Sequence, residues 1–170
     1  INGNLENVWL VYYEGISRAN WLLDNIGGIP MDQERKDEII GESRFLRAYF
    51  YYWLAIIFGD IPVHLSVPSP PEMQKAATPF EQVLTNVILP DLQDAASRLP
   101  ENAAPGRATK YAAWGLLAKC YLFLQDWSMA EEAAKQVTQS THMLTNLYTD
   151  NFTLSGKDNN EAIFSVQHLS

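Results

Sequence analysis

Two arginines three residues apart are the side chains best suited to bind an anion in this 170-residue chain. Arg44 and Arg47 fall on one face of a predicted helix, because residues three apart are neighbours on a helical surface. A pair of guanidinium groups can hold a carboxylate or a phosphate, which would make a ligand clamp. The same groups can instead tie helices together through ion pairs. We favour the ion pairs, and the candidate partners are Asp60, Asp91 and Asp94.

Aromatic side chains offer a second kind of site, because sugar-binding proteins stack pyranose rings on exposed Trp or Tyr. If a glycan touches this chain, we expect contacts from the polar start, at Asn2 and Asn4, and from the loop between His64 and Ser69. Most of the tryptophans are predicted to lie in the core, because all five fall at or beside helix packing positions: Trp9, Trp21, Trp53, Trp114 and Trp127.

Motifs that carry catalysis or metal binding are absent from the sequence. It contains no HExxH, no GxSxG and no P-loop. The histidines, His64, His142 and His168, lack the spacing of metal ligands. The single cysteine, Cys120, lies in an apolar helical segment and is predicted to be a buried structural thiol. We therefore predict no catalytic residue, no metal, no cofactor and no enzymatic activity.

Charge and hydropathy restrict the partners. The formal net charge is -8, which repels a phosphate backbone and argues against nucleic acid. The longest apolar run, Ala48 to Phe58, has 11 residues, whereas a membrane-spanning helix needs ~20. This run is instead predicted to be the centre of the core. The chain has no leader segment and no lipobox cysteine at its start, so we expect an internal piece of a longer protein.

The spacing of apolar residues predicts an all-α fold with minor short β-strands, in a single domain over residues 1–170. Residues 1–58 form the first two helices. Residues 59–78 form a turn and a proline-rich loop. Residues 79–140 contain a third helix and a helical pair. Residues 141–170 form a loop and a terminal strand at 162–166.

Local signals mark the ends of these elements. Gly59 is predicted to cap the second helix, and Asp60 to accept hydrogen bonds from free backbone donors in the turn. Thr78 and Ser128 each precede a Glu by three residues, so both are predicted to be N-caps in a capping box. Pro90 lies inside the third helix and predicts a kink or a break there.

The last helical pair matches a tetratricopeptide (TPR) unit. Its packing positions are predicted to be filled by Trp114, Leu117, Ala118 and Tyr121 in the first helix, and by Ala130, Ala134 and Val137 in the second. The helix before residue 58 gives a weaker match, and its partner helix comes late because the proline-rich loop intervenes. Its corresponding residues are Phe45, Ala48, Tyr49 and Tyr52.

This interrupted repeat carries a family resemblance. Residues 41–54, GESRFLRAYFYYWL, followed by residues 58–63, FGDIPV, resemble the signature of the SusD/RagB family. The resemblance covers essentially the whole chain but only part of a typical family member. It implies structural roles for a set of signature positions, which are Arg44, Phe45, Arg47, Ala48, Tyr49, Gly59, Asp60, Pro62, Arg107 and Trp127.

The resemblance also implies a function. Proteins of this family are lipoproteins on the extracellular face of the outer membrane of Gram-negative bacteria. They bind oligosaccharides, or in some members peptides, and deliver them to a SusC-like TonB-dependent transporter without catalysis. The only membrane attachment it implies is an N-terminal lipid anchor, which is absent from this chain.

A second hypothesis is a TPR-type scaffold that binds a protein or a peptide in its concave groove. An uninterrupted TPR array repeats at about 34 residues, whereas residues 63–77 form a long insertion between helices. The insertion favours the family resemblance over a plain TPR module.

Overall fold

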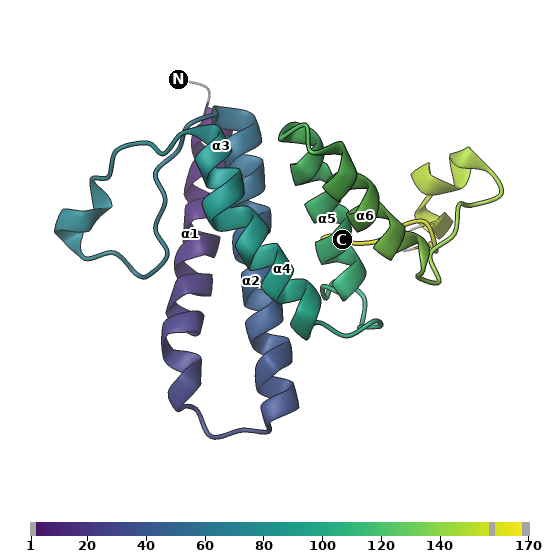
Figure 1. The fold of residues 1–170 in the computed structure, drawn as a ribbon, viewed down its shortest axis with the longest axis horizontal. Coiled ribbons are helices and arrows are strands. Elements are labelled where there is room, and N and C mark those ends of the chain that lie inside the picture. The colour runs from purple at the N-terminus through teal and green to yellow at the C-terminus, as the bar shows by residue number, and fades with distance from the viewer. Residues whose placement is uncertain (1–2, 157–158, 168–170) are drawn as a thin grey trace.

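The computed structural model describes residues 3–156 and 159–167, and they form a stack of helices (Figure 1). The helices pack on one another in the order α1, α2, α4, α5, α6, and α3 continues into α4 through a π-helical segment, η3. The all-α prediction is confirmed. The helix bounds are α1 Gly3–Asn25, α2 Gln33–Phe58, α3 Phe80–Val83, η3 Leu84–Ile88, α4 Leu89–Arg98, α5 Lys110–Phe123 and α6 Trp127–Thr138.

The middle of α2 is the centre of the core. Ala48, Tyr51 and Leu54 are fully buried, because α1 covers one side of α2 and α4 covers another. α1 approaches α2 closely at Gly15, where a Cβ atom would lie 2.4 Å from a ring carbon of Phe50. The run from residue 48 to residue 58 therefore supplies the centre of the core, as its composition indicates, although it is not buried on every side, since Ile57 is 42% exposed.

The proline-rich loop leaves α2 at a glycine and returns through a short backbone pairing. Gly59 has a φ of 76°, and its N–H donates to the carbonyl of Ala55, so it ends α2 as predicted. Ile61 and Thr78 form an isolated antiparallel bridge, with N···O distances of 3.1 and 2.8 Å. This bridge is the β-pairing found in residues 3–156 and 159–167. Short 3-10 helices complete the connections: η1 Ile26–Gly28, η2 Pro70–Met73, η4 Tyr148–Phe152 and η5 Leu154–Gly156.

Two predicted N-caps are wrong. The backbone of Thr78 is engaged in the bridge, so the side chain that caps α3 is Asp60, which accepts from Phe80 N at 2.8 Å. This contact confirms that Asp60 satisfies a free backbone donor. The N-cap of α6 lies two residues earlier than predicted, because Asp126 is the cap and accepts from Met129 N at 3.1 Å. Ser128 therefore lies inside the helix.

The disturbance predicted at Pro90 is a π-helical turn rather than a break. Proline has no N–H to donate and its ring crowds the preceding turn. The backbone accommodates it by widening to the π-helical η3 immediately before α4.

The α5–α6 hairpin packs as a TPR unit, and one of its packing residues differs from the prediction. Leu117, Tyr121 and Ala130 are buried, as predicted. In the second half of α6, however, Ala133 is buried and Ala134 is exposed. The close approach of α5 and α6 therefore depends on Ala130 and Ala133.

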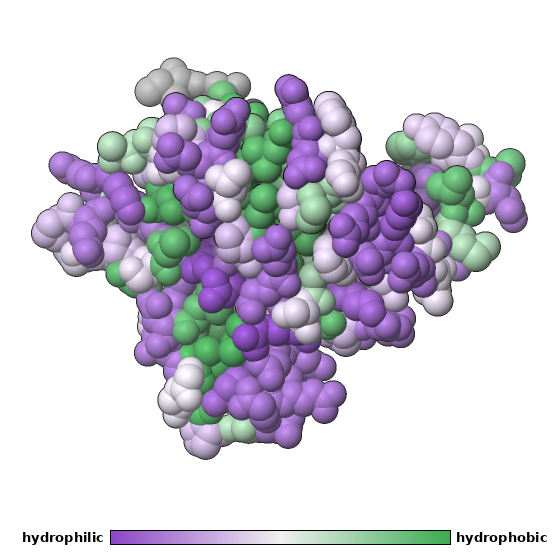
Figure 2. Space-filling model, viewed as in Figure 1, coloured by the Kyte–Doolittle hydropathy of each residue, from purple (hydrophilic) through white to green (hydrophobic). Residues whose placement is uncertain are grey.

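The terminal strand predicted at 162–166 is absent. The segment is irregular, with a bend at Ile163, and Phe164 packs edge-on against Phe45 at 4.9 Å between ring centroids. A strand also needs a neighbouring backbone to pair with, and no described segment supplies one here. Residues 141–156, between α6 and this segment, expose several apolar side chains, and green patches mark this region at the right of Figure 2. The exposed apolar residues are Met143, Leu144, Leu147, Phe152 and Leu154.

Candidate functional site

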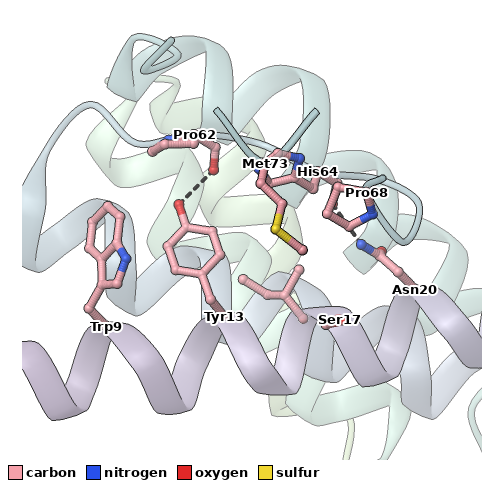
Figure 3. Close-up of a pocket in the computed structure, with 9 residues that line it drawn as sticks. Trp9, Tyr13, Ser17, Asn20, Pro62, His64, Pro68 and Met73 are labelled. Atoms are coloured by element: carbon pink, nitrogen blue, oxygen red, sulfur yellow. Dashed lines mark hydrogen bonds between the residues drawn. The ribbon is translucent and has the colours of Figure 1, made fainter. Parts of the chain in front are cut away.

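A cavity of about 290 Å³ lies between α1 and the proline-rich loop (Figure 3). One wall is a face of α1 and the opposite wall is the loop, so the insertion that interrupts the repeat also builds the cavity. The residues that line it are Trp9, Tyr13, Ile16, Ser17, Asn20, Pro62, His64, Pro68 and Met73.

The α1 wall follows from helical periodicity. Trp9, Tyr13, Ser17 and Asn20 succeed one another at intervals of three or four residues, which places them on one face. The Trp9 and Tyr13 rings lie 4.8 Å apart at 46°, and together they form an aromatic end of the cavity. The Tyr13 hydroxyl donates to the carbonyl of Pro62 at 2.6 Å, which joins this end to the loop. Burial, and secondarily Tyr51, raises the pKa of Tyr13, so its hydroxyl stays protonated.

The loop wall is fixed by hydrogen bonds from buried side chains to its backbone. The Tyr51 hydroxyl donates to the carbonyl of His64 and accepts from its N–H, both at 2.8 Å. Burial raises the pKa of Tyr51 to about 12, against a smaller lowering effect of the His64 backbone hydrogen bond. The Asn20 amide donates to the carbonyls of His64 at 2.8 Å and Ser66 at 3.2 Å. These contacts compensate the burial of backbone polar groups where the loop crosses the helices.

The two signature arginines support this arrangement through an ion pair. Arg47 donates to both carboxylate oxygens of Asp91, at 2.7 and 2.8 Å. Its Nη1 also donates to Asn20 Oδ1 at 2.8 Å and to the carbonyl of Leu65 at 3.2 Å. Arg44 reaches Asp91 at 2.6 Å and Asp94 at 3.6 Å. The ion-pair interpretation therefore matches the geometry, with Asp91 as the shared partner and Asp60 not involved.

Arg47 is 3% exposed and its guanidinium is fully engaged, so it is not available to a ligand. Its role is to orient Asn20, which in turn holds the loop.

A second cavity of about 290 Å³ adjoins the first and shares His64 and Pro68 with it. Its polar groups come from the loop itself. Glu72 accepts from the N–H and the hydroxyl of Ser69, at 2.8 and 2.6 Å, and Lys75 Nζ donates to the carbonyl of Val63 at 2.9 Å. Burial, followed by the charge of Lys75, lowers the pKa of His64, so its ring is neutral at pH 7.

Of the three residues proposed from sequence as glycan contacts, one lies at the cavities. His64 lines both of them. Asn4 lies exposed in the first turn of α1 and is not among the lining residues, and Asn2 lies outside the described residues. The sequence interpretation missed Trp9, Tyr13, Ser17 and Asn20 as cavity residues, although their shared helical face was readable.

Most of the remaining signature positions contribute to the packing of the helices. Arg107 forms a paired hydrogen bond with Glu42 of α2, at 2.7 and 2.6 Å, which ties the start of α5 to α2. Phe45 and Ala48 are buried in the core, and Tyr49 is half-buried beside Phe164. Trp127 opens α6 and is 63% exposed. Trp9, Trp53 and Trp114 are half-buried against the core, whereas the expectation of a core position fails for Trp127 and for Trp21, which is 61% exposed.

Cys120 is fully buried in α5, and burial raises the pKa of its thiol to about 12, as expected of a structural cysteine. In residues 3–156 and 159–167 no group of three or more His, Cys, Asp or Glu side chains could hold a metal ion. None of the helices in those ranges has both the length and the apolarity needed to cross a bilayer.

The stacked helical hairpins, with a cavity beside the insertion, define a helical-repeat protein. A SusD-like family model, described as "Starch-binding associating with outer membrane", matches residues 1–122. The chain therefore belongs to the SusD-like family.

Individual relatives agree. A SusD-like protein of Formosa agariphila is 30% identical over 169 residues, which are 96% of this chain and 32% of that protein. A SusD-like protein from Bacteroides fragilis has a similar structure, with a TM-score of 0.88 and 26% identity over 97% of this chain and 34% of that one. A laminarin-binding SusD-like protein matches with a TM-score of 0.87 and 28% identity over 92% of this chain and 36% of that one. The chain thus spans about a third of the length of these relatives.

Proposed function

We propose that this chain contributes to non-catalytic binding of oligosaccharides through the cavity between α1 and the proline-rich loop. The observation that carries the proposal is the composition of the cavity wall. The aromatic rings of Trp9 and Tyr13 stand beside uncharged groups that can form hydrogen bonds with a ligand, at Ser17 and His64. Sugars present an apolar ring face and a periphery of hydroxyl groups, and this wall complements both.

The family supports the same conclusion. Its description names starch binding, and one structural relative binds laminarin, a glucan. For this chain we propose a ligand of that broad class, an oligosaccharide.

The location and the partner belong to the same proposal. The family description places its members in association with the outer membrane. We propose attachment to the extracellular face through a lipid on the full-length protein, and delivery of the bound glycan to a SusC-like TonB-dependent transporter. Both rest on the family, and co-purification of a transporter with the full-length protein would test the partner.

The binding proposal is tested by screening the full-length protein on a glycan array and measuring affinity for any hit by calorimetry. Trp9→Ala removes the aromatic end of the cavity, and we expect it to weaken binding about tenfold to a hundredfold, since losing a buried aromatic contact costs about 1.5–3 kcal/mol. Trp127→Ala is the matched control, because Trp127 is an exposed tryptophan on α6 and does not line the cavity.

Equal losses in both variants, or none in either, would show that the glycan binds elsewhere. Release of shorter products from the glycan would contradict the non-catalytic role.

A further inference from the structure

The cavity that we propose for glycans has an unusual charge balance for a protein with a net charge of -8. No side chain of Asp, Glu, Lys or Arg lines the first cavity. Its polar contributors are amide, hydroxyl, indole and imidazole groups. A ligand placed there would meet dipoles and no formal charge.

Several of these dipolar groups are unused. The indole N–H of Trp9, the hydroxyl of Ser17 and the ring nitrogens of His64 form no hydrogen bond within residues 3–156 and 159–167. Each can donate to or accept from a sugar hydroxyl. Asn20, by contrast, already donates from its side-chain NH₂ group to the loop backbone and accepts from Arg47 at its side-chain oxygen. The free groups therefore match the periphery of a neutral sugar.

The nearby cations do not compensate an anionic ligand. Arg47 reaches the wall through its bond with Asn20, and it is buried against Asp91. Arg18, which follows Ser17 on α1, forms an ion pair with Glu14. Lys75 lies in the adjoining cavity, donates to the carbonyl of Val63, and faces the carboxylate of Glu72 in the same lining. The His64 ring is neutral at pH 7, because burial and Lys75 lower its pKa, an effect that Glu72 opposes.

From this balance we infer that the site selects uncharged sugar rings and discriminates against uronic acids and sulfated sugars. This inference rests on the proposed glycan-binding function and specifies its substrate class. Moving a carboxylate or a sulfate out of water requires a compensating cation. The cavity supplies none, and the negative field of the whole chain adds a long-range repulsion that salt screens.

The test compares matched neutral and acidic glycans on the full-length protein, at about 0.15 M salt. Three pairs isolate the charge: laminarin against C6-oxidised laminarin, carboxyl-reduced polygalacturonate against polygalacturonate, and β-1,4-linked mannan against polymannuronate. We expect the protein to bind the neutral member of at least one pair. Its acidic counterpart should bind at least about tenfold more weakly.

A charge introduced into the wall provides the second arm. Ser17→Lys places an ammonium group at the cavity, and we expect it to strengthen binding of the acidic member about tenfold without strengthening the neutral one. Ser17→Ala is the control for loss of the hydroxyl. Comparable thermal unfolding of both variants and the parent protein shows that the fold is kept.

The outcomes separate the two claims. Equal or tighter binding of an acidic member by the parent protein overturns the selectivity and leaves the glycan-binding function intact. Failure of all six glycans, with none bound on a wider array, overturns the proposed function and the selectivity with it.

Discussion

The molecule contains two helical hairpins whose first helices can be aligned residue by residue. Their packing positions are the same, but the side chains that fill them differ in polarity. In the interrupted hairpin, α2 is followed by α3 and α4 only after residues 59–79. In the direct hairpin, α5 reaches α6 through residues 124–126 alone. When α5 is aligned on α2, Trp114 corresponds to Phe45 and Tyr121 corresponds to Tyr52, and both tyrosines are buried.

At matching positions the interrupted hairpin is polar and the direct hairpin is apolar. Arg47 corresponds to Leu116, and Tyr51 corresponds to Cys120; all four side chains are buried. The reason is the loop. Its backbone carbonyls at residues 64–66 lie against the helices and need donors, and Tyr51, Arg47 and Asn20 supply them. The direct hairpin buries no such loop, so a thiol and a leucine suffice.

The largest expected difference between the hairpins comes from breaking the ion pair. Asp91→Leu leaves the buried guanidinium of Arg47 without its partner, and we expect a loss of about 3–5 kcal/mol in the free energy of unfolding. The comparison in the direct hairpin is Cys120→Ser, which buries an unpaired hydroxyl and should cost about 1–3 kcal/mol. Urea denaturation followed by far-UV circular dichroism measures both.

A double variant sharpens this result. Adding Arg47→Met to Asp91→Leu removes the uncompensated charge, so part of the lost stability should return. If the double variant is less stable than Asp91→Leu, the ion pair is not what makes Asp91 important.

The second difference concerns glycines at helix contacts. In α1, Gly15→Ala would place a Cβ atom 2.4 Å from Phe50 of the interrupted hairpin. We expect a loss of about 1–3 kcal/mol from the forced repacking. In α5, Gly115→Ala meets only ordinary contacts, 4.0 Å from Ile163 and Val137. It should stabilise the protein by about 0.5–1 kcal/mol through helix propensity. Thermal unfolding should therefore shift in opposite directions, and a shared direction would contradict the packing difference.

The third difference isolates hydroxyl groups. Tyr51→Phe removes a donor and an acceptor that hold His64, and we expect a loss on the order of 1–2 kcal/mol. Tyr121→Phe removes only an acceptor for Gln93, at 3.1 Å, and should cost about 0.5–1 kcal/mol. Glycan affinity should fall in Tyr51→Phe alone, because only that hydroxyl positions the cavity wall. Equal affinities in the two variants would mean that the loop keeps its position without Tyr51.

The sequence predicted the parts of this comparison that depend on local pattern. Apolar spacing located the helices, and the glycine at 59 located the end of α2. It also named Asp91 among the partners of the arginines. The helix predictions that failed involve choices between residues one or two positions apart. Asp126 caps α6 in place of Ser128, and Ala133 is buried in place of Ala134. One residue along a helix changes the direction of a side chain by about 100°. An apolar pattern that is only approximately periodic does not distinguish two neighbouring positions.

The cavity was less predictable for a different reason. The links between Asn20 and Ser66, and between Arg47 and Asn20, join residues 46 and 27 positions apart. No local pattern encodes such a contact. The terminal segment failed similarly, because residues 162–166 have the composition of a strand, but a strand exists only where another backbone pairs with it.

The smallest expected effect compares how the two long loops are anchored. The backbone at residues 64–66 in the loop at 59–78 is held by Tyr51, Asn20 and Arg47, none of which changes its charge between about pH 3 and pH 7. The loop at 141–161 is held by the exposed carboxylate of Glu161, which accepts from Asn151 and from the N–H and hydroxyl of Thr145, each at 3.0 Å. The hydrogen bond from Asn151, followed by those from Thr145, lowers the pKa of Glu161.

Because the folded-state pKa of Glu161 is below its unfolded value, its contribution to order is complete above the ordinary glutamate range, about pH 4.3. It is lost as the pH falls through the lowered value. Amide hydrogen exchange, corrected for its intrinsic pH dependence, should therefore show the 141–161 loop losing protection in acid while the backbone at 64–66 keeps it. Glu161→Gln should remove this pH dependence. If both loops lose protection together in the parent protein, acid acts on the core they share, and the separate anchoring of the two loops is wrong.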